Sequence, residues 1–200
     1  VKALKIAAKI RRNQLGLECE LAVGQELNSL RSQGFHVFHD LPADKFNIDH
    51  VIVGPTGVFA VETKGRSKPM RGKGKADARV VFDGNSLKFP TWTETNSIEQ
   101  ARRQARWLRN WLTRAVGEQV DVVPALALPG WFIERISRAD MPVYNGLRPD
   151  SIFPNFGKRR FDNSMIQRIA HQLDQQCRDV EIKSDRHTKS GNRQFEKAQA

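Results

Sequence analysis

The segment from Asn47 to Lys64, NIDHVIVGPTGVFAVETK, constrains the fold of this 200-residue chain more than any other. Two apolar runs flank the residues GPTG at 54–57, which are typical of a tight turn, so the segment predicts a β-hairpin. With this turn, the register places Asp49 opposite Glu62. Both strands are apolar on both faces, which is typical of strands inside a sheet that is covered on both sides.

Side chains alternate along a strand, so the hairpin has two distinct faces. One face carries Asp49, Val51, Val53, Val58, Ala60, Glu62 and Lys64, and the other carries His50, Ile52, Phe59 and Val61. Like charges directly opposite each other destabilise a sheet, and burying a carboxylate is costly. A bound divalent cation is the usual compensation, and oxygen ligands suit Mg²⁺ or Mn²⁺.

Two interpretations of this acidic pair follow from the residues alone. In the first, Asp49 and Glu62 bind the cation, and Lys64 orients or polarises a water that attacks a phosphate. In the second, the acids lie exposed at the strand ends, where Lys64 and nearby arginines neutralise them. His50 points away from Asp49 in a regular strand, which favours a packing role for this histidine.

Three segments of the chain resemble the nuclease-related domain (NERD) family, a branch of the PD-(D/E)xK nuclease superfamily. They are LECELAVGQEL from Leu17, FHVFHDLPADKFNIDHVIVGPTGVFAVETK from Phe35, and SIEQARRQARWL from Ser97. The similarity runs from about Leu15 to about Trp131. It implies an α/β fold with a restriction-endonuclease-like core, in which helices flank a central mixed β-sheet. It also implies a divalent-metal-dependent nuclease that hydrolyses phosphodiester bonds of DNA.

The resemblance assigns a role to each candidate catalytic residue. Glu20 resembles the acid of the first helix, Asp49 the aspartate of the core motif, Glu62 and Lys64 its Glu-x-Lys half, and Gln100 the glutamine of the next helix. Asp49, Glu62 and the carbonyl of Thr63 are the implied metal ligands, with Mg²⁺ as the ion and Mn²⁺ as an alternative. Lys64 is the implied catalytic cation.

Some of these assignments have competitors. Glu18 and Glu26 lie close to Glu20, and a lone helix glutamate is ordinarily a solvated surface residue. Cys19 stands where the family often has glycine before this acid, and Ile48 replaces the superfamily proline before Asp49.

Charge supports a partner rich in phosphates. The chain has 33 basic and 22 acidic residues, a formal net charge of +11 and a pI near 10.1. This balance is typical of proteins that bind nucleic acid. Basic residues alternate with glycines after Glu62 and predict a loop that binds DNA without sequence preference. A solvated loop without a partner would have the same composition. The basic residues are Lys64, Arg66, Lys68, Arg71, Lys73 and Lys75.

The two cysteines and the motifs that the sequence lacks exclude several classes of protein. Cys19 and Cys177 form neither a disulfide framework nor a zinc pattern, so we expect a cytoplasmic location. The chain has no run long enough for a membrane span, no GxSxG elbow and no Walker loop. Serine hydrolases and P-loop ATPases are therefore disfavoured. A non-catalytic or partner-dependent nucleic-acid-binding module stays open, as do RNA as the partner and a homodimer.

Periodicity and turn residues predict the remaining elements. We expect a basic helical extension over 1–14, a nuclease domain over 15–180 and a polar, flexible tail over 181–200. Leu17, Leu21, Leu27 and Leu30 are predicted to form the buried side of the first helix. The other predicted elements are strands at 36–40, 79–82, 86–89, 120–128, 142–144 and 151–152, a helix from Ser97 that this serine caps, and a helix over 161–177. The helix from Ser97 is expected to bury an apolar side made of Ile98, Ala101, Ala105, Leu108, Leu112 and Ala115. Its tryptophans are expected to pack against the sheet, and its arginines spread over the rest of its surface.

Overall fold

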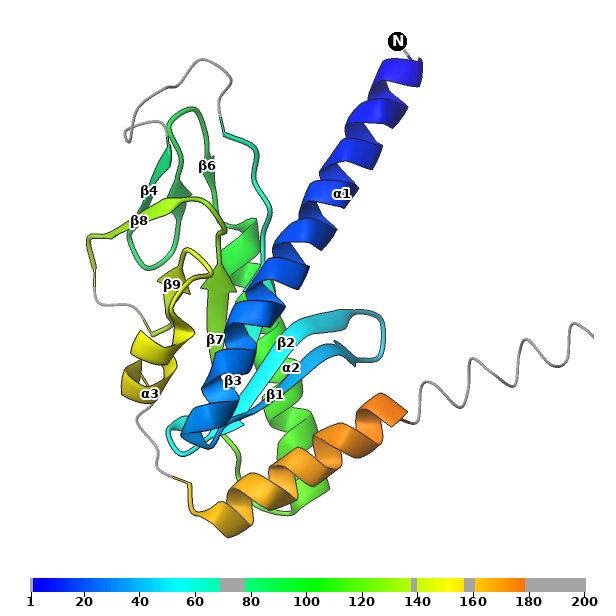
Figure 1. Cartoon of the computed structure of the whole chain (residues 1–200), viewed down its shortest axis with the longest axis vertical. Helices are drawn as coiled ribbons and strands as arrows, with labels where there is room; N and C mark the ends of the chain where they lie inside the picture. Colours follow the sequence, from blue (N-terminus) through cyan, green and yellow to red (C-terminus); the bar gives the residue numbers. More distant parts are fainter. Residues whose placement is uncertain (1, 69–77, 138–139, 157–160, 179–200) are drawn as a thin grey trace, which may run out of the picture.

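The structure is a computed structural model of the chain, and it describes residues 2–68, 78–137, 140–156 and 161–178 (Figure 1). The helices are α1 (Lys2–Leu27), η1 (Asn28–Gln33), α2 (Asn96–Val116), η3 (Pro149–Ser151), α3 (Phe153–Phe156) and a last helix over 163–178. The strands are β1 (His36–Pro42), β2 (Asn47–Gly54), β3 (Gly57–Thr63), β4 (Arg79–Phe82), β5 (Leu87–Lys88), β6 (Thr93–Glu94), β7 (Val122–Ala127), β8 (Phe132–Arg135) and β9 (Val143–Tyr144).

The strands form a central five-stranded sheet in the order β1-β2-β3-β7-β9 and a smaller four-stranded sheet in the order β6-β5-β4-β8. In the central sheet, β1, β2 and β3 are antiparallel neighbours, whereas β7 runs parallel to β3 and β9 runs parallel to β7. The long connection from β3 to β7 contains α2, as a parallel crossover requires. The predicted α/β class with a mixed central sheet is confirmed.

The predicted hairpin is present with the predicted register. Val53 lies opposite Val58, and the ladder continues to His50 opposite Val61, so Asp49 and Glu62 are the next residues along it. Gly54 is required at the turn because a Cβ atom there would lie 2.0 Å from Cδ1 of Phe35.

The two faces of the hairpin pack as the alternation predicts. Val51, Val53, Val58 and Ala60 share a core with Leu108 and Leu112 of α2 and with Ile166 and Ile169 of the helix over 163–178. Ile52, Phe59 and Val61 share a second core with Val23 and Leu27 of α1 and with Leu30 and Phe153. Helices therefore cover both faces of the central sheet (Figure 1).

The prediction that Leu17 and Leu21 belong to the buried side of α1 is wrong. Leu17 and Leu21 are 57% and 59% exposed, whereas Leu27 and Leu30 are fully buried. The helix reaches the sheet with Val23 and Leu27 on its inner side, and its N-terminal half extends away from the sheets (Figure 1).

Two other local predictions are wrong. Ser97 does not cap α2, because the helix begins at Asn96 and the Ser97 hydroxyl donates a hydrogen bond to Glu94. Residues 151–152 do not form a strand, because Pro149–Ser151 forms a short 3₁₀ helix. The last helix is capped by Asp162, whose Oδ1 accepts a 2.8 Å hydrogen bond from the backbone N–H of Met165.

Every helix in the described part of the chain is too short or too polar to span a membrane. Within the described residues, neither Cys19 nor Cys177 forms a disulfide. The predicted tail over 181–200 lies outside the described residues.

Candidate active site

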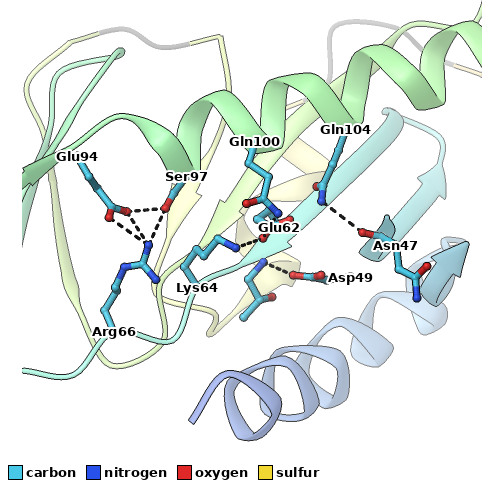
Figure 2. A network of polar contacts seen from close by, with 10 residues as sticks. Asn47, Asp49, Glu62, Lys64, Arg66, Glu94, Ser97, Gln100 and Gln104 are labelled. Carbon is cyan, nitrogen blue, oxygen red and sulfur yellow. Dashed lines mark hydrogen bonds and ion pairs between the residues drawn. The ribbon is translucent and has the colours of Figure 1, made fainter. Parts of the chain in front are cut away.

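The candidate site lies where the end of β3 meets the first turns of α2. Glu62 is 1% exposed at this point, and its Oε1 accepts a 2.8 Å hydrogen bond from Nε2 of Gln100. The ammonium group of Lys64 forms an ion pair with the same oxygen. Figure 2 shows Lys64 and Gln100 both pointing toward Glu62, with Asp49 nearby. Strand alternation and the position of α2 thus bring together side chains that are up to 51 residues apart in sequence, from Asp49 to Gln100.

Asp49 is held by the neighbouring strand. Its Oδ2 accepts a 2.7 Å hydrogen bond from the backbone N–H of Thr63. Burial and the negative charge of Glu62 raise the pKa of Asp49 to about 7, although the hydrogen bond from Thr63 and the charge of Lys64 oppose this shift. A single positive side chain therefore does not offset two carboxylates in this buried position.

Glu20 lies on α1, beside this pair. Burial and the charge of Glu62 raise its pKa, and Lys64 lowers it, so Glu20 experiences the field of the same groups. Its competitors Glu18 and Glu26 are exposed residues of the same helix, whereas Glu20 is half-buried. The geometry favours Glu20 over both as the helix acid of the site.

The fit of these residues to a divalent ion can be judged from the unpaired oxygen atoms. Oε2 of Glu62 is buried and has no hydrogen-bond partner among the described residues, and the same is true of Oγ1 of Thr63. A buried carboxylate oxygen without a partner is costly, and a cation would satisfy it. The described residues contain no cluster of three or more histidine, cysteine or acidic side chains arranged to hold a metal. Mg²⁺ commonly uses only one or two carboxylates together with waters, so the pair Asp49 and Glu62 fits this ion.

Arg66 has a structural partner that the sequence did not indicate. Its guanidinium donates hydrogen bonds of 3.0 and 3.1 Å to the two carboxylate oxygens of Glu94 and one of 3.1 Å to the hydroxyl of Ser97. The backbone carbonyl of Arg66 also accepts a 3.1 Å hydrogen bond from Nε1 of Trp131. The contacts of the guanidinium with Glu94 and Ser97 anchor the chain that leaves β3 to the start of α2 (Figure 2).

Of the other predicted DNA contacts, Lys64 and Lys68 belong to the described residues. Lys68 is exposed, and Lys64 lies in the site itself. Arg71, Lys73 and Lys75 lie outside the described residues.

Gln104 is a second residue that the motifs did not assign to the site. It is buried one turn beyond Gln100, and its Nε2 donates a 3.4 Å hydrogen bond to the carbonyl of Asn47 on β2. This contact joins α2 to the strand that carries Asp49. The spacing of Gln100 and Gln104 along one side of the helix was the available signal.

His50 and its neighbour His39 lie on the other face of the sheet from Asp49. His50 is 4% exposed on the α1 side of the sheet, and its Nδ1 lies 3.0 Å from Nδ1 of His39. Burial and the neighbouring His39 lower the pKa of His50 to about 4, so its ring is neutral at pH 7. The predicted packing role of His50 is confirmed.

A mixed sheet whose central hairpin ends in Asp, Glu and Lys, beside a helix that contributes glutamine, is a nuclease-like core. The family model described as nuclease-related domain (NERD) matches residues 15–129, which is more than half of the chain. The chain belongs to this family, as its motifs predict. No curated protein and no solved structure matches the chain.

Proposed function

We propose that this protein is a divalent-metal-dependent nuclease that hydrolyses phosphodiester bonds of DNA at Asp49, Glu62 and Lys64. The observation that carries the proposal is the carboxylate of Glu62. It is buried, one oxygen is bound by Gln100 and Lys64, and the other lacks a partner in the described structure. Such an arrangement is costly for folding alone, and costly buried charges are typical of functional sites.

Asp49 and Glu62 are the proposed ligands of Mg²⁺, or of Mn²⁺, together with the carbonyl of Thr63. A divalent ion bound there would supply Lewis acidity toward a phosphate oxygen and a bound water of lowered pKa. The raised pKa of Asp49, about 7, supports this assignment, because a cation would offset the repulsion between the two carboxylates.

The remaining residues have supporting roles in the proposal. Lys64 orients the attacking water or stabilises negative charge on the phosphate in the transition state. Gln100 holds the carboxylate of Glu62 by its 2.8 Å hydrogen bond, so that the second oxygen keeps one direction. Glu20 assists the network from α1, where it already interacts electrostatically with Glu62 and Lys64.

The net charge of +11 supports a nucleic acid as the substrate. Lys68 and the basic residues that follow it are the proposed contacts to the phosphate backbone, with Arg71, Lys73 and Lys75 among them. Such contacts position a strand without reading its sequence.

The test is cleavage of linear and supercoiled DNA in Mg²⁺, Mn²⁺ or EDTA by the native protein, Asp49→Asn and Glu62→Gln. Glu134→Gln is the matched control, because Glu134 is an acid of the small sheet that pairs with Arg79. We expect metal-dependent cleavage by the native protein and the control, and at least a hundredfold loss in both site variants. Full cleavage by Glu62→Gln would overturn the site.

DNA binding is measured in parallel by fluorescence anisotropy. The site variants should bind about as tightly as the native protein, because they remove negative charge. Tight binding by all four proteins without any cleavage would favour a non-catalytic or partner-dependent binding module instead. An RNA substrate in the same assay shows whether the enzyme discriminates between the two nucleic acids.

A further inference from the structure

Helix α1 carries a row of large apolar side chains that face solvent. The row consists of Ile6, Ile10, Leu17 and Leu21, which are 53%, 61%, 57% and 59% exposed. Spacings of four, seven and four residues place all of them on one side of the helix, away from the buried Val23 and Leu27. We call these four residues the α1 stripe. Four large apolar side chains exposed in one row are typical of a site of interaction.

The N-terminal half of α1 has little support from the rest of the molecule. Residues 3–14 are all exposed, and this part of the helix extends beyond the sheets (Figure 1). An isolated helix of about 12 residues is only marginally stable in water. A partner that covers the α1 stripe would therefore also stabilise the helix that carries it.

Charge along α1 is segregated in a way that indicates which partner this is. Residues 3–12 contain Lys5, Lys9, Arg11 and Arg12 and no acid, whereas residues 13–27 contain Glu18, Glu20 and Glu26 and no base. Basic residues near the N-terminus and acidic residues near the C-terminus oppose the helix dipole, so this order does not stabilise the helix by itself. It is complementary to the same helix running in the opposite direction.

We propose that α1 pairs with α1 of a second copy of this chain, as an antiparallel coiled coil along the α1 stripe. Ile10 then lies opposite Leu17 of the partner subunit, and Ile6 lies opposite Leu21 of the partner subunit. The twofold axis passes near Asn13 and Gln14, polar residues in the middle of the seam that fix its register.

Charged residues beside the seam fit this register. Arg11 follows Ile10, and Glu18 follows Leu17 seven residues later, so both lie on the same flank of the α1 stripe. In the antiparallel pair, Arg11 meets Glu18 of the partner subunit, and the twofold axis repeats the contact. An anionic membrane surface would attract the basic half of α1 but repel Glu18 beside Leu17, so it fits the whole stripe less well.

The test is the molar mass of the full chain, measured by sedimentation equilibrium over a range of concentrations. The native protein should form a dimer, and the double variant Ile10→Asp, Leu17→Asp should form a monomer. The near-ultraviolet circular dichroism of this variant should be unchanged, because α1 contains no aromatic residue and the signal reports on the rest of the fold. Leu4→Asp is the matched control, because Leu4 is 77% exposed on the same helix but lies on another side. The control should dimerise like the native protein.

A charge exchange tests the direction of the pair. Arg11→Glu and Glu18→Arg should each weaken the dimer about tenfold, because each replaces two attractive contacts with two repulsive ones. The double variant should return to within about threefold of the native affinity. The proposal would be overturned if the native protein were a monomer at every concentration. It would also be overturned if the double variant failed to recover the dimer affinity that each single variant loses. Binding of the monomer to vesicles that contain phosphatidylserine would instead assign the stripe to a lipid surface.

Discussion

Gln100 donates a 2.8 Å hydrogen bond to Oε1 of Glu62, the same oxygen that meets the ammonium group of Lys64. Both partners therefore engage one side of the carboxylate, and Oε2 stays buried without a partner in the described structure. The first turns of α2 thus fix the orientation of an acid that belongs to the sheet.

The first prediction concerns this hydrogen bond. Gln100→Ala should raise the Mg²⁺ concentration needed for half-maximal DNA cleavage about 10- to 100-fold, as loss of an outer partner of a metal ligand commonly does. Gln104→Ala is the control, because Gln104 lies one turn further along α2 and its Nε2 donates its hydrogen bond to the carbonyl of Asn47 instead of to Glu62. An unchanged Mg²⁺ requirement in Gln100→Ala would show that the hydrogen bond has no part in the site.

The second prediction concerns pH. The pKa of Asp49 is about 7 in the folded protein and near 3.8 in an unfolded chain, so the folded state binds the extra proton between these values. The free energy of unfolding of the metal-free protein should therefore fall by a few kcal/mol as pH rises from about 4 to about 7, and change little above that. Urea unfolding in EDTA measures this slope.

The variant Asp49→Asn should lose most of this pH dependence of the free energy of unfolding. At pH 8 without metal, it should be more stable than the native protein. Asp83→Asn is the control, because hydrogen bonds from Ser86 and Asn85 lower the pKa of Asp83 to about 2 on the surface. Equal slopes in Asp49→Asn and the native protein would contradict the assignment of the raised pKa.

The hairpin was predictable because its determinants are local. A four-residue turn and a period of two residues fix both the register and the faces, so the sequence alone places Asp49 beside Glu62 and predicts which apolar residues share each core. The helical period likewise predicts the buried side of α2.

The remaining features depend on how separate segments meet. The ion pair of Arg66 with Glu94 joins residues that are 28 apart, and neither belongs to a motif. Leu17 and Leu21 have the spacing of a buried side, but they lie on a different side of α1 from Val23 and Leu27 and face solvent. Helical period alone cannot show which of two apolar sides of a helix faces the sheet.

The third prediction concerns metal binding without any reaction. Mg²⁺ or Mn²⁺ should raise the melting temperature of the native protein at pH 8, because an ion that binds only the folded state stabilises it by about 2.7 kcal/mol at 100 times its Kd. Glu62→Gln should lose this shift and Glu134→Gln should keep it. Scanning calorimetry with and without EDTA provides the measurement, and an equal shift in Glu62→Gln would place the metal elsewhere.

The fourth prediction concerns the turn that sets the register. Gly54→Ala should destabilise the protein by about 3 kcal/mol or more, because the added Cβ would lie 2.0 Å from Cδ1 of Phe35, whose ring is 5% exposed and packed in the core. Gly16→Ala is the matched control. Its Cβ meets no atom within 4 Å, and alanine in the middle of α1 should stabilise the helix by about 0.5–1 kcal/mol.

A double-mutant cycle links this loss of stability to the contact with Phe35. Phe35→Ala creates space at the ring, so Gly54→Ala should cost clearly less in that background than in the native protein. Chemical denaturation of the four proteins gives the coupling energy. If Gly54→Ala costs the same in both backgrounds, its effect arises from the backbone of the turn. In that case, close packing of the ring of Phe35 against β2 is not what makes glycine necessary at this position.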